Sequence, residues 1–264
     1  MNVLYLGDVV GPSGMRALTT SLPSLRQQYS LDFVAVNGEN ATRGFGLRPD
    51  DMHRLFHCGV DLISSGNHIW QREELRSSFS ENIPLLRPAN YPSGAPGCGH
   101  YLLSSAKGML AIVNLQGRER MGMAVDCPFQ TAEELIRQIR HQTQCILVDF
   151  HAEDVREKEA LFALLDGQVS GVLGTHTHVQ TVDARVLSGG TAVMTDLGMC
   201  GPIKSVIGTK PELSLRRSLT QLPLQMEVSE NPAMLCGALL EIDPDTGHAL
   251  SITRFCQMPG EENL

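Results

Sequence analysis

Short aliphatic runs alternate with longer helix-like stretches from the N-terminus to about residue 200 of this chain. This alternation is typical of a layered α/β fold. Seven runs have the length and composition of buried strands, at residues 3–6, 33–36, 60–64, 110–115, 145–150, 171–173 and 192–195. The stretches between them that favour helices are residues 13–29, 48–58, 131–141 and 156–165. We therefore expect a sheet-based core covered by helices.

Two segments depart from this alternation. Residues 84–108 are rich in proline and glycine, which predicts an ordered loop or a small lid near a site rather than a linker between domains. From residue 222 onward, apolar and polar positions alternate, and the turn at residues 243–247 predicts an antiparallel hairpin. The strands expected there are residues 224–228, 234–242 and 248–255. We expect residues 1–264 to form a single domain.

The composition excludes several classes of protein. Of the 264 residues, 42% are apolar and 19% are charged, as in ordinary globular proteins. No run reaches the roughly 18 apolar residues of a membrane span, and the N-terminus lacks the pattern of a secretory signal, so we expect a cytoplasmic protein without a membrane partner. The net charge of −8 disfavours a stable nucleic-acid complex. Seven cysteines without a Cys-x-x-Cys pair indicate reduced thiols.

Polar residues that can bind a metal directly follow five of the predicted strands. They occur in the sequences Gly7-Asp8, Asn37-Gly38-Glu39-Asn40, Gly66-Asn67-His68, His151-Ala152-Glu153 and His176-Thr177-His178. Because ligands bind at the carboxyl ends of strands in open α/β sheets, we expect these segments to converge. Each segment alone has an ordinary explanation, such as Asp8 capping a helix or His151 being a hydrogen-bonded core histidine. Together they favour a metal site.

The residue types narrow the choice of metal. His176 and His178 are two positions apart, so on an extended segment both imidazoles would lie on one side, where a cation would hold both neutral. Oxygen and imidazole ligands without thiolates suit manganese, iron or zinc. The candidates exceed the three or four ligands of one catalytic ion, so two divalent metal ions are expected. The candidate ligands are Asp8, Glu39, Asn67, His151, His176 and His178.

Two neighbouring cations would determine the chemistry of the site. Their charge outweighs that of two carboxylates and a bridging hydroxide, so the pocket would attract phosphate although the protein is acidic. Such a pair activates a shared water and stabilises both the attacking and the leaving oxygen at phosphorus. The chain has neither a Gly-x-Ser-x-Gly motif nor a glycine-rich phosphate loop. These features predict hydrolysis of a phosphoester.

Six segments carry a family resemblance: Gly7-Asp8-Val9-Val10-Gly11, Asn37-Gly38-Glu39-Asn40-Ala41, Ser65-Gly66-Asn67-His68, Asp149-Phe150-His151-Ala152-Glu153, Gly174-Thr175-His176-Thr177-His178-Val179-Gln180-Thr181 and Thr195-Asp196-Leu197-Gly198-Met199. In this order, from residue 1 to about 255, they resemble the YmdB-type branch of the calcineurin-like metallophosphoesterases. The resemblance implies a four-layer α/β/β/α sandwich. It also implies a dinuclear site that hydrolyses cyclic nucleotides, 2′,3′-cyclic and also 3′,5′-cyclic, by a metal-bridged hydroxide.

The resemblance also assigns roles to individual residues. It implies that Asp8 and His178 hold one ion and that Glu39 bridges to the second. The second ion would be held by Asn67, His151 and His176. It further implies that Asn40 lies beside the site against the substrate, and that His68 stabilises or protonates the leaving oxygen.

Some alternatives stay open from the sequence. His68 would have a different role if it only orients Asn67. Asp196 is either a partner of a ligand histidine or a helix cap, and Arg16 and Arg43 are left out of the catalytic set. The expected substrate is a small phosphodiester or nucleotide, but a phosphomonoesterase would use the same ions, and a regulatory interaction protein would hydrolyse only incidentally. The sequence is compatible with a homo-oligomer.

Overall fold

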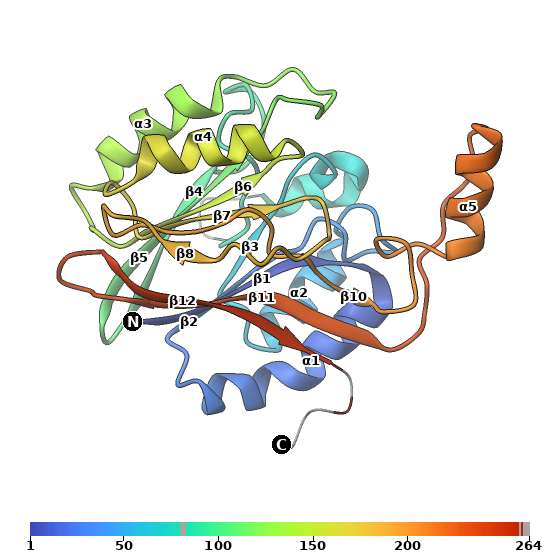
Figure 1. Ribbon diagram of the computed structural model, residues 1–264, viewed down its shortest axis with the longest axis horizontal. Helices are drawn as coiled ribbons and strands as arrows, with labels where there is room; N and C mark the ends of the chain where they lie inside the picture. The colour runs from blue at the N-terminus through green and yellow to red at the C-terminus, as the bar shows by residue number, and fades with distance from the viewer. Residues whose placement is uncertain (80–82, 259, 261–264) are drawn as a thin grey trace.

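The structure is a computed structural model that describes residues 1–79, 83–258 and 260. Within these residues, two six-stranded β-sheets lie face to face (Figure 1). The first sheet has the order β12-β11-β10-β1-β2-β3, with β1 also paired to β11, and consists of β1 (Asn2–Val9), β2 (Phe33–Asn37), β3 (Leu62–Ser64), β10 (Met199–Pro202), β11 (Ala233–Ile242) and β12 (Ala249–Gln257). The second has the order β4-β5-β6-β7-β9-β8, and consists of β4 (His100–Ser105), β5 (Gly108–Gln116), β6 (Ile146–His151), β7 (Gly171–Thr175), β8 (Arg185–Val186) and β9 (Ala192–Met194).

Helices cover the outer face of each sheet. Helices α1 (Gly11–Gln28) and α2 (Pro49–His57) pack on the first sheet, and α3 (Pro128–Ile139) and α4 (Val155–Leu165) pack on the second. Two short 3₁₀ helices, η1 (Ile69–Gln71) and η2 (Glu73–Ser78), follow β3. The layer order is therefore α/β/β/α, which confirms the predicted fold class. Helix α5 (Pro211–Thr220) extends away from these layers (Figure 1).

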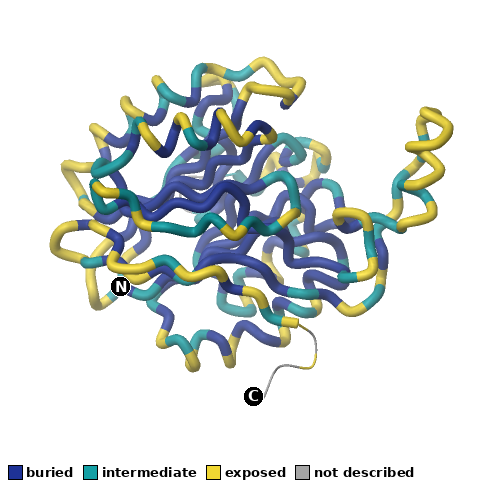
Figure 2. The backbone as a smooth tube through the Cα atoms, viewed as in Figure 1, coloured by how far each residue is buried: buried dark blue, intermediate teal, exposed yellow. Residues whose placement is uncertain are grey.

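Strand β1 shows how the sequence builds these layers. Successive side chains of a strand point to opposite faces, so its apolar run is divided between two cores. Val3 and Tyr5 pack against the second sheet, where they meet Leu147 of β6. Leu4 and Leu6 belong to the core beneath α1 and α2. Figure 2 shows the central strands of both sheets buried along most of their length, whereas the edge strand β12 is largely exposed. The parallel strands are thus covered on both faces, as their continuous apolar runs predict.

Most of the predicted elements are present. Every apolar run expected before residue 200 is a strand, and the four expected helices are α1 to α4, with ends shifted by a few residues. The predicted hairpin is confirmed, because β11 and β12 pair antiparallel along their length. Within the part of the chain that the structure describes, no helix is long and apolar enough to cross a membrane.

Two expectations about the local structure are wrong. Residues 224–228 form no strand; Val228 makes only an isolated bridge to Thr209, because this segment lies outside both sheets. Residues 84–108 are a loop only in part, because β4 occupies residues 100–105 and pairs antiparallel with β5. Leu103 of β4 is buried between the two sheets. Elements β8, β10 and α5 were not expected from the sequence.

Candidate functional site

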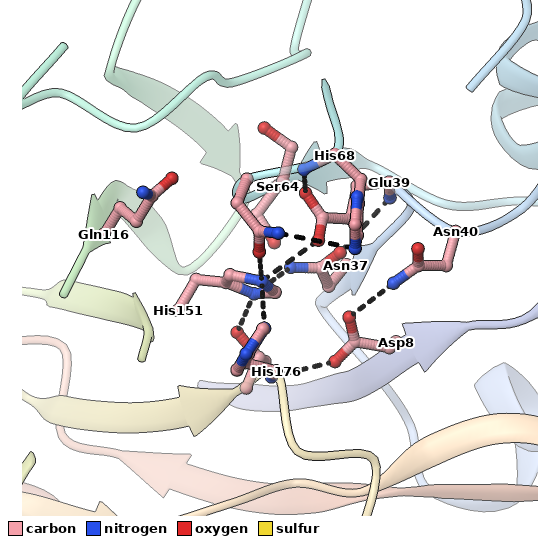
Figure 3. Close-up of polar contacts among 12 residues, drawn as sticks. Asp8, Asn37, Glu39, Asn40, Ser64, His68, Gln116, His151 and His176 are labelled. Carbon is pink, nitrogen blue, oxygen red and sulfur yellow. Dashed lines mark hydrogen bonds and ion pairs between the residues drawn. The ribbon is translucent and has the colours of Figure 1, made fainter. Parts of the chain in front are cut away.

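The carboxyl ends of strands from both sheets meet at one place, and the polar residues singled out in the sequence lie there. Figure 3 shows Asp8, Glu39, Asn40, His68, His151 and His176 lying together. Asp8 lies within β1 rather than after it, and α1 has Val10 at its N-cap without a side-chain cap. The interpretation of Asp8 as a helix cap is therefore wrong. Each sheet supplies part of the cluster, so the site exists only when both sheets are packed together.

Three potential metal ligands surround Nε2 of His151. Oδ1 of Asn67 and Oε1 of Glu39 each lie 3.0 Å from this nitrogen, and Nδ1 of His176 lies 3.1 Å away. The approach of His151 to Glu39 lacks the angles of a hydrogen bond, so among the described residues Oε1 is a buried oxygen without a hydrogen-bond partner. Lone pairs that converge on one buried point fit a cation better than a hydrogen-bond network.

The other ring nitrogen of His151 is fixed by a chain of hydrogen bonds. The hydroxyl of Thr175 donates its only hydrogen to Oδ1 of Asp149, at 2.7 Å. Oγ1 of Thr175 can therefore accept from Nδ1 of His151, 2.9 Å away, and this contact is shorter than the 3.2 Å approach of the Asn37 amide nitrogen to the same atom, which favours the ring hydrogen on Nδ1. Burial raises the pKa of Asp149 to about 6, so the carboxylate is ionised at neutral pH. In the neutral imidazole, Nε2 of His151 then carries the lone pair that a metal ligand requires.

Asp8 and His178 form a second group of ligand atoms. Nε2 of His178 lies 3.6 Å from Oδ1 of Asp8, and its Nδ1 donates to the carbonyl oxygen of Ile207 at 2.9 Å. This hydrogen bond leaves the lone pair of Nε2 facing the site. The amide of Asn40 donates to Oδ1 of Asp8 at 3.1 Å and lies 3.3 Å from Nε2 of His178. Asn40 is thus placed between both residues of this group.

The two groups adjoin at Glu39. Asp8, Glu39 and His151 each offer an atom within 4.8 Å of the others, and all three are fully buried. Oε2 of Glu39 accepts from the backbone N–H of His68 at 2.9 Å, which leaves Oε1 as the open position. Glu39 therefore lies between the two groups, at the place that the resemblance assigns to a bridging carboxylate.

The charges of the site fit a bound cation. Burial lowers the pKa of His151, but the charges of Glu39, Asp8 and Asp149 outweigh this effect and raise it to about 9. Burial and the charge on His151 lower the pKa of His176 to about 3. Without a metal ion, a proton on His151 is thus the local counter-charge to the buried carboxylates. A divalent cation would replace that proton and leave the imidazoles free to act as ligands.

The two histidines after β7 do not lie on an extended segment, contrary to the expectation from their spacing. The strand ends at Thr175, and His176 and His178 have φ angles of +103° and +65°. These turns direct His176 toward His151 and His178 toward Asp8. Both rings reach the site, but they do so by backbone turns that cost about 1–3 kcal/mol each and not by sharing one side of a strand.

Asp196 holds this strained backbone in place. Its Oδ2 accepts from the backbone N–H of Thr177 at 3.1 Å, and its Oδ1 accepts from that of Gly198 at 2.8 Å. The buried ammonium of Lys158 donates to Oδ2 of Asp196 at 3.0 Å and to the carbonyl oxygen of Thr175 at 3.1 Å. Asp196 therefore neither contacts a ligand imidazole nor caps a helix. It fixes the chain between the two histidines.

His68 lies at the edge of the cluster and is partly exposed. Its ring packs edge-to-face against Phe45, with ring centroids 5.5 Å apart. Nδ1 lies 2.8 Å from the amide nitrogen of Gln71, and Nε2 lies 3.3 Å from that of Asn67. The ring also lines the pocket over the cluster. This position is compatible with both roles considered for His68, proton donor to the substrate and orienting partner of Asn67.

A pocket of about 630 Å³ opens over the ligand atoms. Its lining includes Asn40, His68, Glu153, His176, Thr177 and His178, together with residues of the segment 206–228, which adjoins the site through the hydrogen bond from His178 to Ile207. Arg217 also lines this pocket, whereas Arg16 lines a separate cavity. The contribution of this segment was not expected from the sequence, although residues 214, 217, 218 and 221 follow a helical spacing that would have placed them on one face.

Comparison with known proteins identifies the family. Residues 4–255 match the model of the family described as YmdB-like protein. The chain belongs to the YmdB-like family. This YmdB-like protein is 42% identical over 256 residues to the 2′,3′-cyclic-nucleotide 2′-phosphodiesterase of Bacillus subtilis (strain 168), a match that covers 97% of this chain and 96% of that relative. The family resemblance noted in the sequence is thereby confirmed.

Solved structures share the fold. A hypothetical protein from Thermus thermophilus has a TM-score of 0.92 and 39% identity, covering 98% of this chain and 100% of the other. The crystal structure of a novel phosphatase from Mycoplasma pneumoniae has a TM-score of 0.90 and 34% identity, covering 99% of this chain and 95% of the other. The similarity therefore extends over whole chains.

We expect the Thr175→Val variant to bind Mn²⁺ about 10–100-fold more weakly, because Nδ1 of His151 loses the hydroxyl that fixes its tautomer. Calorimetric titration of the chelator-treated protein measures this affinity. Thr175→Ser keeps the hydroxyl and is the matched control, with binding close to that of the unchanged protein. Equal affinities of the Val and Ser variants would contradict the role given to this hydrogen bond.

Proposed function

We propose that this YmdB-like protein is a metal-dependent phosphodiesterase that hydrolyses 2′,3′-cyclic nucleotides at the described site. The observation that carries the proposal is the buried Oε1 of Glu39, which has no hydrogen-bond partner among the described residues. It lies between two groups of oxygen and imidazole side chains, beside a pocket that His176 and His178 line. The name of the Bacillus subtilis relative supports the substrate class. Small phosphodiesters fit a pocket of about 630 Å³.

The proposed ligand sets follow the two groups of side chains. Asp8 and His178 would hold one cation, and Glu39 would contact both. The other cation would be held by Asn67, His151 and His176. Two bound divalent cations would supply an activated water and charge stabilisation at phosphorus. Manganese or iron suits these oxygen and nitrogen ligands, and zinc is the third candidate.

The residues around these ligands would position the substrate and move a proton. Asn40 lines the pocket, and its amide group donates one hydrogen to Oδ1 of Asp8. The second hydrogen of the amide can be donated to a phosphate oxygen of the substrate. In the proposed reaction, a water oxygen forms a bond to phosphorus while the bond from phosphorus to the 2′ oxygen breaks. His68 gives a proton to that leaving oxygen, the proton that the water loses restores His68, and the product is a 3′-nucleotide. We also propose that the protein is a cytoplasmic homo-oligomer with a single domain. Sedimentation velocity tests the oligomeric state, and cell fractionation tests the location.

A substrate panel tests the proposed function. We expect protein purified without chelator to contain manganese or iron, and to hydrolyse 2′,3′-cyclic nucleotides faster than 3′,5′-cyclic nucleotides or monoesters. Chelation should remove the activity, and Mn²⁺ or Fe²⁺ should restore it. Metal analysis and product separation by chromatography provide the measurement. Faster hydrolysis of monoesters would contradict the proposal in favour of a phosphomonoesterase, and activity that survives complete metal removal would contradict the metal site.

The role of His68 has a separate test. A general acid contributes about 10²–10⁴-fold and matters least when the leaving group is already good. We therefore expect His68→Ala to reduce hydrolysis of a 2′,3′-cyclic nucleotide far more than hydrolysis of a bis(4-nitrophenyl) diester. Steady-state kinetics at matched metal content compare the two substrates. Equal losses on both would show that His68 only orients Asn67.

A further inference from the structure

The pocket that His176 and His178 line also carries a guanidinium group that the proposed hydrolysis leaves unused. Arg217 lines this pocket together with Ser214, Ser218 and Gln221. These positions recur at spacings of three and four residues, so they occupy one face of α5 and the turn that follows it. Within the described ranges, the side chain of Arg217 has neither a hydrogen bond nor an ion pair. It is therefore free to bind a ligand.

The arrangement of α5 is the reverse of an ordinary amphipathic helix. None of its residues is buried, and the helix projects from the body of the molecule (Figure 1). Its polar face lines the pocket, whereas Leu215 and Leu219 are 61% and 76% exposed. A surface helix normally directs its apolar side chains inward and its polar ones to solvent. Arg217 itself is exposed, and its guanidinium can exchange water for a polar ligand in the pocket that it lines.

The residues that line the pocket differ in their chemistry. His176 and His178 are metal-ligand candidates, and the carboxylate of Glu153 lies 3.3 Å from Nε2 of His176. Apolar side chains, including those of Phe45, Met226 and Val228, line the pocket as well. Arg217 is the one permanent positive charge among the described residues lining the pocket. A ligand that matches this pattern has one phosphate at the ligand atoms, a less polar part, and a second anionic group.

We propose that Arg217 binds a second phosphate, carried on the 5′ oxygen of the nucleotide whose 2′,3′-cyclic phosphate is hydrolysed. This inference rests on the proposed function. A guanidinium forms charge-assisted, bidentate hydrogen bonds with phosphate oxygens, and the nearby hydroxyl of Ser218 supplies another donor. The second phosphate has two sources, a terminal 5′-phosphate on a mononucleotide or the diester that links the last two nucleotides of an oligonucleotide. Both have the same chemistry at Arg217.

Three substrates test this inference: adenosine 2′,3′-cyclic phosphate, the same nucleotide with a 5′-phosphate, and an adenosine dinucleotide that ends in a 2′,3′-cyclic phosphate. We expect the unchanged protein to favour at least one of the two substrates with a second phosphate by roughly tenfold in kcat/KM, mainly through a lower KM. The dinucleotide and the 5′-phosphorylated mononucleotide distinguish the two sources. Arg217→Gln should remove the preference while leaving kcat for the plain cyclic nucleotide unchanged.

Arg216→Gln is the matched control, because Arg216 lies on the same helix but does not line the pocket. It should keep the preference. Calorimetry adds a measurement independent of turnover: adenosine 3′,5′-bisphosphate should bind more tightly than adenosine 3′-phosphate, and only Arg217→Gln should abolish the difference. Equal kcat/KM for all three substrates, or a preference that survives Arg217→Gln, overturns the inference but leaves the proposed function intact. Failure of the unchanged protein to hydrolyse any of them overturns both.

Discussion

Two buried carboxylates, those of Asp8 and Glu39, impose the constraint on which the rest of this structure depends. Both side chains are fully buried, and removing a carboxylate from water costs several kcal/mol unless hydrogen bonds and opposite charge compensate. Three of their four oxygens accept a hydrogen bond from Asn40, His68 or His176. Among the described residues the fourth, Oε1 of Glu39, accepts none. The buried carboxylates therefore require positive charge beside them, which protonated His151 supplies without a metal ion and a divalent cation would supply in its place.

The backbone at Gly66 and after β7 allows the side chains of the site to lie close together. A side chain on Gly66 would place its Cβ 2.0 Å from the ring of His151, so only glycine leaves room for the imidazole. Beyond β7, the positive φ angles of His176 and His178 store strain that the buried Asp196 and Lys158 pair restrains. Strain of this kind persists only where the surrounding contacts over-determine it. The site is therefore preorganised by the protein itself.

The sequence predicted the layers and the cluster for one physical reason. Parallel strands covered on both faces need continuous apolar runs, and the polar residues that follow such runs lie at one edge of the sheets. Strand β10, Met199–Pro202, has no such local signal, because it forms by pairing with β1 and β11. Helix α5 has no buried residue, and its Leu215 and Leu219 face solvent, so the usual rule that apolar side chains point inward gives the wrong orientation for it. The position of Arg217 in the pocket lining could not be predicted from local sequence either, because it depends on the path of the segment that follows β10.

The orientation of individual side chains was less predictable than their identity. The spacing of His176 and His178 suggested an extended segment, whereas the chain turns at both residues. A positive φ at a histidine depends on tertiary contacts, here those of Asp196, so the local sequence pattern does not predict it. The assignment of each side chain to a particular ion remains a prediction from the family resemblance.

Anomalous diffraction from crystals grown with excess manganese tests the central claim most directly. The account predicts two manganese peaks about 3.5–4 Å apart, one between Asp8 and His178 and one among Asn67, His151 and His176, with Glu39 in contact with both. Crystals with bound manganese elsewhere, and none among these side chains, would contradict it.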